Sequence, residues 1–244
     1  MKNVLSNDFK VFANRVAKIP FVKSLLRPIY YPYKRHLSNK RNTQFKKYAV
    51  NVLQEFDSIM ASIEVDYSLA YGSMLGAVRE HGFIEHDLDI DVFLRAEDYS
   101  IKIKDSLIAS GFSVVHIFTL EDGKLGRAET YCKYDVSIDL FYVYPAIDSR
   151  GDYTCVFSPF PGYITWKHSQ DSKGGLLVQK WDTPLSRSTI KMKFESLMLP
   201  VSSNYDELLK LTYGELYMVP DPNFHGEGIH CYEEWRGKIG ILEK

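Results

Sequence analysis

The chain has 244 residues, of which 45% are hydrophobic and 25% charged, and its formal net charge is −1. These ordinary globular values exclude a disordered or fibrous chain, and the length suffices for one large domain or two small ones. Three cysteines without CxxC spacing argue against a disulfide framework and for a reducing compartment. We find neither a long uncharged apolar stretch nor a signal peptide, so a cytoplasmic protein is expected.

Positive charge is concentrated in the first 47 residues, which hold twelve Lys or Arg against one acid, Asp8. We divide the chain into a basic N-terminal arm, 1–43, and a folded, more acidic domain, 44–244. Because the basic residues of 1–47 alternate with apolar ones, we expect the arm to lie on an anionic membrane, peripherally at its inner face. Packing on the acidic body or a solvated linker are the alternatives. No nucleic-acid partner is expected, because the acidic body would repel a phosphate backbone.

The predicted elements begin with short helical pieces, because Pro20, Pro28 and Pro32 interrupt the arm. Apolar residues at helical spacing then predict an amphipathic helix from 45 to 63. The later elements are predicted as strands at 67–71, 89–94, 112–118, 128–133, 136–143, 153–157 and 189–194, and helices at 73–80, 97–110 and 205–211. Helices and strands interleave early and strands dominate the middle. The predicted fold class is therefore α+β (mixed α/β), with a mixed sheet flanked by helices.

Three aspartates, Asp87, Asp89 and Asp91, lie within five residues where an apolar strand begins. Residues two apart on a strand point to the same face, so Asp89 and Asp91 are expected side by side, with Ile90 and Val92 in the core. An unpaired pair of carboxylates on a sheet is costly. A divalent cation removes that cost, and Mg²⁺ takes one or two carboxylates together with phosphate oxygens and water. The sequence therefore predicts a metal site at Asp89 and Asp91.

A further acid, Asp139, interrupts the predicted strand 136–143 between Ile138 and Leu140. If this strand lies beside the first one, at a spacing of about 4.8 Å, Asp139 faces the same metal. The alternative is that all these acids lie on the surface of an edge strand. The apolar flanks of both strands argue against that alternative.

Gly72 and Ser73 stand between a predicted strand and a predicted helix. Glycine lets a backbone approach a ligand closely, and the first turn of a helix offers free N–H groups and a positive dipole end. We therefore expect a phosphate at this turn, with the Ser73 hydroxyl as an additional donor. Arg79, at the end of the same helix, is a candidate to bind the phosphate. An ion pair between Arg79 and one of the acids between 80 and 87 is the alternative.

These residues are similar to the signature of a known family. GSMLGAVREHGFIEHDLDIDVFL closely resembles the signature of the LicD/fukutin-type transferases, which belong to the nucleotidyltransferase-fold superfamily. SIDLFYVYP and FESLMLPVSSNYDELLKLTYGELYMVPDP extend the resemblance to about residues 45–222. Leu88 stands where the family often has another Asp, and His86 where it often has Trp. Asp89 and Asp91 remain, so the predicted metal site is kept, whereas His86 is expected to alter the substrate end of the pocket.

The resemblance implies a nucleotidyltransferase-like fold and transfer of a phosphorylated small alcohol, such as phosphocholine or phosphoribitol. The donor is CDP-activated, the acceptor is a sugar hydroxyl of a glycan or lipid-linked glycan, and CMP is released. The resemblance further implies that Asp89 and Asp91 hold Mg²⁺ or Mn²⁺. Asp139 is then a further ligand or the base on the acceptor hydroxyl. Asp87 and Arg79 complete the candidate catalytic residues.

Two basic residues on the strand before Asp139, Arg127 and Lys133, are candidates to bind the phosphates of the donor, or else surface charges. Two other functions stay open. One is a nucleotidyltransferase that uses an NTP directly on a sugar or small molecule. The other is a non-catalytic family member that binds a glycan or nucleotide.

Overall fold

The computed structural model describes the backbone of residues 20–85, 87–148, 151–220 and 232–244, and the side chains of these residues from 41 onward. The chain divides into two compact units, Met1–Thr43 and Gln44–Lys244. Each is considered by itself, and the second carries the candidate site. Most side chains of the basic arm lie outside the described residues, so membrane binding by the arm stays a prediction. In the described part of the chain, no helix is both long and apolar enough to cross a membrane.

Helix α2 runs over Pro20–Ser62, so the expectation that prolines divide this region into short pieces is wrong. Pro20 is the first residue of the helix, where a missing N–H costs nothing. Pro28 and Pro32 lie inside the helix, and each removes one backbone donor. Their fixed φ is nevertheless close to the helical value, and good helix formers lie before Pro28 (Leu, Arg) and after Pro32 (Lys, Arg). These neighbours continue the helix through both positions.

The last turns of α2 form the amphipathic helix that the sequence predicted at 45–63. The buried residues recur at helical spacing: Phe45, Ala49, Val52, Leu53, Phe56 and Met60. They belong to the same hydrophobic core as the buried residues of the central strands. Burying a side chain such as Phe or Leu contributes about 1.5–3 kcal/mol. This stripe therefore anchors the part of α2 that belongs to the second unit in the core of that unit.

The fold class is α+β, as predicted from the sequence. The helices after α2 are α3 (Tyr71–Arg79), η1 (Ala96–Asp98, a 3-10 helix), α4 (Ile101–Ala109), α5 (Trp166–Lys173) and α6 (Tyr205–Tyr213). The strands are β1 (Ser68–Leu69), β2 (Asp89–Arg95), β3 (Ser113–Leu120), β4 (Gly126–Lys133), β5 (Val136–Val143), β6 (Tyr153–Ser158), β7 (Leu176–Asp182), β8 (Thr189–Phe194), β9 (Leu197–Ser202) and β10 (Tyr232–Leu242).

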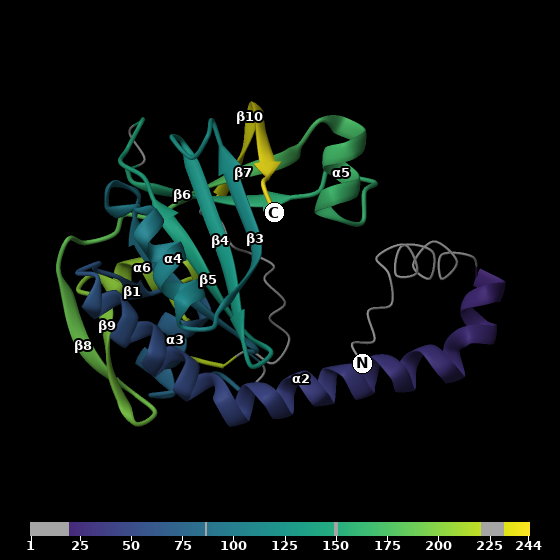
Figure 1. Cartoon of the computed structure of the whole chain (residues 1–244), viewed down its shortest axis with the longest axis horizontal. Coiled ribbons are helices and arrows are strands. Elements are labelled where there is room, and N and C mark those ends of the chain that lie inside the picture. Colours follow the sequence, from purple (N-terminus) through teal and green to yellow (C-terminus); the bar gives the residue numbers. More distant parts are fainter. Residues whose placement is uncertain (1–19, 86, 149–150, 221–231) are drawn as a thin grey trace. The chain divides into compact units, whose positions relative to one another are not determined.

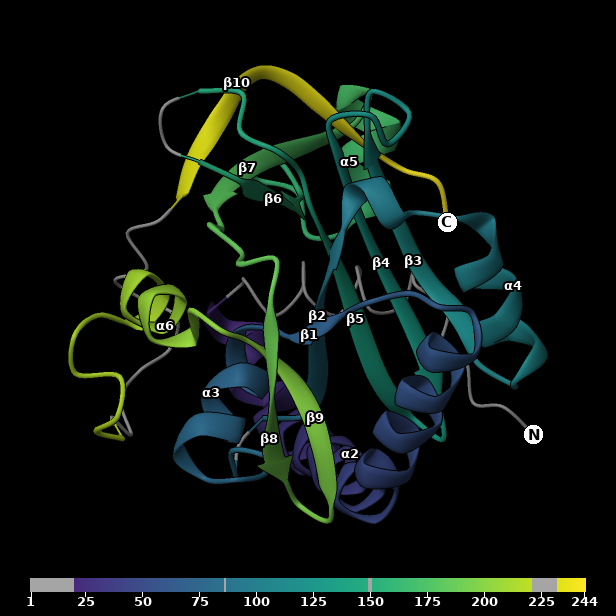
Figure 2. The same ribbon diagram turned by 90° about the vertical axis from the view of Figure 1, so that its left-hand side faces the viewer.

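Eight of these strands form one mixed sheet in the order β1-β2-β5-β4-β3-β10-β7-β6, and β8 pairs with β9 in a separate hairpin (Figure 1). Strands β2 and β5 pair in parallel, and the other described pairs of the large sheet are antiparallel. Figure 2 shows α4 and the last turns of α2 on one side of β3, β4 and β5, with α3 and α6 on the other. The parallel pair carries the acids on which the predicted site depends.

Candidate active site

The parallel pair of β2 and β5 brings together acids that lie far apart in the sequence. Asp91 lies directly opposite Asp139, and Asp89 lies opposite Ser137. The alternate positions of both strands, such as Ile90 and Val92, are fully buried, whereas the acids are half-buried. Asp91 and Asp139 therefore point to the same face of the sheet, as the sequence led us to expect if the two strands were neighbours.

Four carboxyl groups share this part of the sheet, and we call Asp87, Asp89, Asp91 and Asp139 the acid row. Burial and the negative charges of Asp89, Asp139 and Asp87 raise the pKa of Asp91 well above its usual range. A hydrogen bond from the Gly72 backbone N–H to the Asp91 carboxylate opposes this rise. Like charges at such proximity disfavour full ionisation of the group. The acid row therefore favours a positively charged ligand.

Gly72 passes the acid row with no room for a side chain. A Cβ at this position would overlap the Asp87 carboxylate and would lie 3.7 Å from a carboxylate oxygen of Asp91. Glycine is required here because the backbone approaches the acids closely, and not because of its backbone conformation, since the φ of Gly72 is not positive. The Gly72 N–H lies at the start of α3, so the positive end of the helix dipole faces the acids. The helix start and the acid row border the same region.

Ser73 has a different position from that of the predicted phosphate donor. Its side chain is buried, and its Oγ accepts a hydrogen bond from the Asp91 backbone N–H at 2.9 Å. The Ala70 N–H donates to the Asp91 carbonyl oxygen, also at 2.9 Å. These two bonds hold the turn before α3 against the backbone of β2 at Asp91. In this structure Ser73 connects the helix to the strand.

Asp139 accepts a hydrogen bond that the sequence analysis missed. Thr130 lies opposite Asp139 on β4 and donates its hydroxyl to Asp139 Oδ1 at 2.5 Å. The bond fixes the orientation of the carboxylate. A sequence signal was available, because only two residues, Tyr134 and Asp135, separate the predicted strands 128–133 and 136–143. Both residues have positive φ in the structure. A two-residue hairpin turn of this kind sets the register that pairs Thr130 with Asp139.

Arg127 does not reach the acid row. Thr130 faces the row, and Arg127 is three residues away on the same strand, so it projects from the opposite face of the sheet. Its guanidinium donates to Glu129 at 2.9 Å and lies 4.0 Å from the centre of the Tyr99 ring. Both members of the pair are buried, and Glu129 also accepts a hydrogen bond from the Tyr131 hydroxyl. Arg127 belongs to a buried charged cluster beside Tyr99, on the face of the sheet opposite to the acid row.

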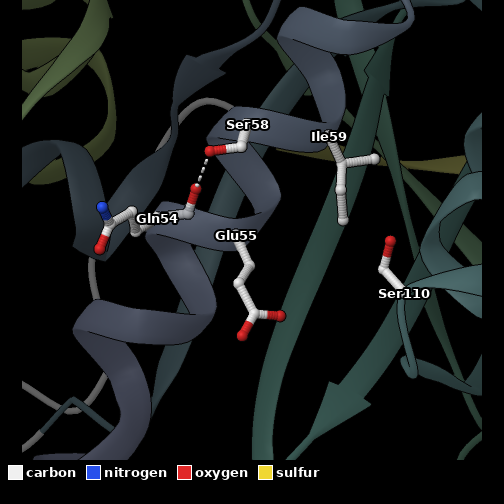
Figure 3. Close-up of a pocket in the computed structure, with 5 residues that line it drawn as sticks. All are labelled: Gln54, Glu55, Ser58, Ile59 and Ser110. Atoms are coloured by element: carbon white, nitrogen blue, oxygen red, sulfur yellow. Dashed lines mark hydrogen bonds between the residues drawn. The ribbon is translucent and has the colours of Figure 1, made fainter.

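Lys133 also projects from this opposite face, three residues beyond Thr130. Its ammonium group pairs with Glu55 of α2 and donates to the Ser110 carbonyl at 2.7 Å. An open pocket lies beside this contact (Figure 3) and is lined by Gln54, Glu55, Ser58, Ile59 and Ser110. The pocket is across the sheet from the acid row and is not part of the candidate site.

Arg79 lies at the end of α3 opposite to Gly72, about 10 Å away along the helix axis. Its guanidinium donates to Glu80 at 2.8 Å and to the Tyr217 carbonyl at 3.2 Å. The structure thus shows the ion pair that was the alternative to phosphate binding. His86, which the sequence analysis placed at the substrate end of the pocket, lies outside the described residues.

The residues present suit a hard divalent cation. The acid row offers only carboxylate oxygens, and these are the ligands that Mg²⁺ and Mn²⁺ prefer. Among the described residues, no three His, Cys, Asp or Glu side chains are already arranged to hold a metal ion. Metal binding by Asp89, Asp91 and Asp139 therefore stays a prediction, which the chemistry of the donor set supports.

A family model described as LicD/FKTN/FKRP, nucleotidyltransferase domain, matches residues 64–204. The chain belongs to this family. The matched segment contains the Gly72 turn and the whole acid row.

Three curated relatives differ in how much of each protein is matched. The chain is 31% identical over 121 residues to the uncharacterized protein T07A5.1 of Caenorhabditis elegans, covering 48% of this chain and 32% of that protein. It is 38% identical over 50 residues to the lipopolysaccharide cholinephosphotransferase LicD of Haemophilus influenzae, covering 20% and 19%. It is 22% identical over 201 residues to the ribitol-5-phosphate transferase FKTN of Mus musculus, covering 78% and 40%. The chain thus spans less than half the length of these relatives.

Proposed function

We propose that this LicD-family chain is a metal-dependent phosphotransferase. It would move a phosphoalcohol, such as phosphocholine or phosphoribitol, from a CDP-activated donor to a sugar hydroxyl of a cell-surface polysaccharide or glycolipid. The names of two relatives, a cholinephosphotransferase and a ribitol-5-phosphate transferase, support this class of reaction. The observation that carries the proposal is the side-by-side placement of Asp91 and Asp139 next to the Gly72 turn.

Each group at the site has a role in this proposal. Asp89 and Asp91 would hold Mg²⁺ or Mn²⁺, which when bound neutralises charge on the diphosphate of the donor. The positive dipole end of α3 lies beside the same region, which suits a phosphate oxygen, while the Gly72 N–H already donates to Asp91. Asp87, which lies against Gly72, limits the space on that side of the turn.

The proposed transfer step is a substitution at phosphorus. The acceptor hydroxyl oxygen forms a bond to the phosphorus that carries the alcohol. The bond between that phosphorus and the CMP oxygen breaks, and its electron pair leaves with CMP. The hydroxyl proton passes to a carboxylate, and we assign it to Asp139, which Thr130 holds through one oxygen. A role of Asp139 as a further metal ligand is the alternative.

The test is whether the purified chain releases CMP from a CDP-activated donor. CDP-choline, CDP-ribitol, CDP-glycerol and CDP-ethanolamine are each incubated with the protein and Mg²⁺ or Mn²⁺, with and without methyl glycosides as acceptors. We expect CMP from at least one donor, with loss of the signal in EDTA and in Asp89→Asn. Asp135→Asn is a matched control, because Asp135 is exposed in the turn between β4 and β5.

The same assay separates the other two functions. NTPs replace the CDP donors in a parallel series, and pyrophosphate is measured. Pyrophosphate without CMP would identify a nucleotidyltransferase that uses NTP directly. Neither product from any donor, with Asp89→Asn behaving like the parent chain in nucleotide binding, would identify a non-catalytic member and overturn the proposal.

We also propose that the basic arm brings the enzyme to an anionic membrane that holds a lipid-linked acceptor. The charge of residues 1–47 supports this, since each basic residue near such a surface contributes about 1 kcal/mol. Full-length chain should sediment with phosphatidylglycerol vesicles and not with phosphatidylcholine vesicles. Replacing Lys10, Arg15, Lys18 and Lys23 by Gln should weaken that sedimentation. Equal sedimentation of both proteins would contradict this role of the arm.

A further inference from the structure

Tyr71 has a backbone conformation that is unusual for its residue type. Its φ is 39°, in the left-handed region, and it directly precedes Gly72. A residue other than glycine is strained in this region, and it remains there only where its surroundings fix it. The cause of the strain should therefore lie in what holds the Tyr71 side chain.

Three aromatic rings from two parts of the sheet surround the Tyr71 ring. The centres of the Phe93 and Phe141 rings, on β2 and β5, each lie 4.9 Å from its centre. The Trp181 ring, on β7, lies 5.6 Å away. All three contacts are edge-to-face, which is the favourable arrangement for aromatic pairs. Phe93 and Phe141 follow the acid row by two residues on their strands, so they share its face.

The Tyr71 hydroxyl begins a chain of hydrogen bonds into the far part of the sheet. It lies 2.8 Å from the Thr154 hydroxyl of β6, which lies 3.1 Å from the Thr183 hydroxyl. Thr183 donates to the Trp181 carbonyl at 3.0 Å. Each hydroxyl has one proton, so Thr154 donates to Thr183 and Tyr71 donates to Thr154. Thr154 and Thr183 are buried, so water does not replace these bonds.

We propose that Tyr71 is a positioning residue for the site. Its side chain ties the Gly72 turn to β6 and β7, and this connection holds the left-handed backbone at Tyr71. The next N–H in the chain, that of Gly72, is thereby fixed on the Asp91 carboxylate. Strands that contribute no residue to the acid row thus determine the geometry of the turn beside it. The catalytic consequence rests on the proposed function, whereas the structural one does not.

The first test measures amide hydrogen exchange at Gly72 in the full chain. Tyr71→Phe keeps the ring contacts and removes only the hydroxyl. We expect Gly72 to exchange about tenfold faster in this variant, the effect of losing one buried hydrogen bond. Tyr67→Phe is the matched control, because the Tyr67 hydroxyl also donates to another side chain, Asp57, at 2.7 Å, and its ring also packs edge-on against an aromatic ring, that of Phe56.

The control separates a local effect from general destabilisation. Both variants lose one tyrosine hydroxyl bond, so we expect similar losses in urea unfolding. The exchange rate of Gly72 should stay within about twofold of the parent in Tyr67→Phe, since that bond is not connected to the turn. Equal acceleration in both variants, or none in Tyr71→Phe, would overturn the proposal.

A double-mutant cycle tests the connection itself. Thr154→Val removes the acceptor of the Tyr71 hydroxyl, together with the bond to Thr183, and should accelerate Gly72 exchange at least as much as Tyr71→Phe does. The double variant should be no faster than Thr154→Val alone, because that substitution already breaks the bond that Tyr71→Phe removes. Additive effects would show that the two residues act separately, and would contradict the proposed connection between Tyr71 and β6.

The second readout is binding and turnover. Titration with Mn²⁺ and CDP should give about tenfold weaker binding in Tyr71→Phe, and kcat for CMP release should fall by at least as much. Both should change less than about twofold in Tyr67→Phe. If the parent chain neither binds CDP nor releases CMP, the proposed function fails, and the exchange experiment still decides the role of Tyr71.

Discussion

Replacing Asp91 by Asn removes one charge from the acid row and keeps the shape of the side chain. Asp91 lies opposite Asp139 on paired strands about 4.8 Å apart. At a pH above the raised pKa of Asp91, where both groups are ionised, two full charges about 5 Å apart repel by about 3 kcal/mol at an effective dielectric constant of about 20. Asn accepts the Gly72 N–H less strongly than a carboxylate does, which costs about 1 kcal/mol. We therefore expect Asp91→Asn to stabilise the metal-free chain by about 2 kcal/mol, or about 4–8 °C in Tm.

The pH dependence of this gain has a definite sign. Burial and the neighbouring acids raise the pKa of Asp91 in the folded chain above that in the unfolded chain. The contribution of the group to stability is then fully present below the unfolded pKa of about 4 and is lost as the pH rises through the folded pKa. The Asn side chain does not titrate. The advantage of the variant should therefore be small near pH 4 and should grow as the pH rises.

Urea unfolding in EDTA at about pH 5 and about pH 8 measures the difference. Asp135→Asn, in an exposed turn, should change the free energy of unfolding by less than about 0.5 kcal/mol. Adding Mn²⁺ at about a hundred times its Kd should stabilise the parent by about 2.7 kcal/mol and the Asn variant far less. A parent chain at least as stable as Asp91→Asn at both pH values would refute the account of the acid row.

Three other substitutions test separate parts of the site. Gly72→Ala places a methyl group on the Asp87 carboxylate, so we expect a loss of about 1–3 kcal/mol in urea unfolding and at least tenfold slower CMP release. Thr130→Val removes the donor to the aspartate on β5 and should slow CMP release about tenfold, with recovery in Thr130→Ser; equal rates in Val and Ser would argue against an orienting role. Arg127→Met leaves Glu129 buried without its cation, so we expect a loss of about 3–5 kcal/mol with an unchanged KM for the donor. A higher KM in the folded variant would instead support donor binding by Arg127.

Strands with strong apolar alternation were predictable from the sequence. The bounds predicted for 136–143 and 189–194 agree with β5 and β8. Four elements were missed: α5, β7, β9 and β10. Helix α5 has a polar sequence, WKHSQDSK, and is defined by its ends. The Thr165 hydroxyl accepts the His168 N–H at 3.1 Å, and Gly174 ends the helix with φ of 76°.

Strand β10 was missed for a different reason. Its apolar and polar residues do not alternate, and its pairing with β7 shifts between Glu234 and Ile239. A register shift of this kind moves side chains to the other face of the sheet. The period-2 pattern that identified the earlier strands is therefore absent, and only the pairing partners on both sides define the strand.

Part of the candidate site was also predictable from the sequence, and part of it was not. The sequence by itself determined which acids share a face, because residues two apart on a strand point the same way, and Asp89 and Asp91 follow that spacing. The same rule excludes Arg127 and Lys133 once Thr130 is known to face Asp139. That pairing depends on the turn between β4 and β5, so it is still local in the chain.

Only the tertiary structure decided how the Gly72 turn is held. The left-handed backbone of Tyr71 has no signal in the sequence, since tyrosine seldom adopts it. It is maintained by contacts with Thr154 and Trp181, more than 80 residues further along the chain. Local spacing is fixed by the geometry of the backbone, whereas contacts across such separations depend on how the whole sheet is assembled.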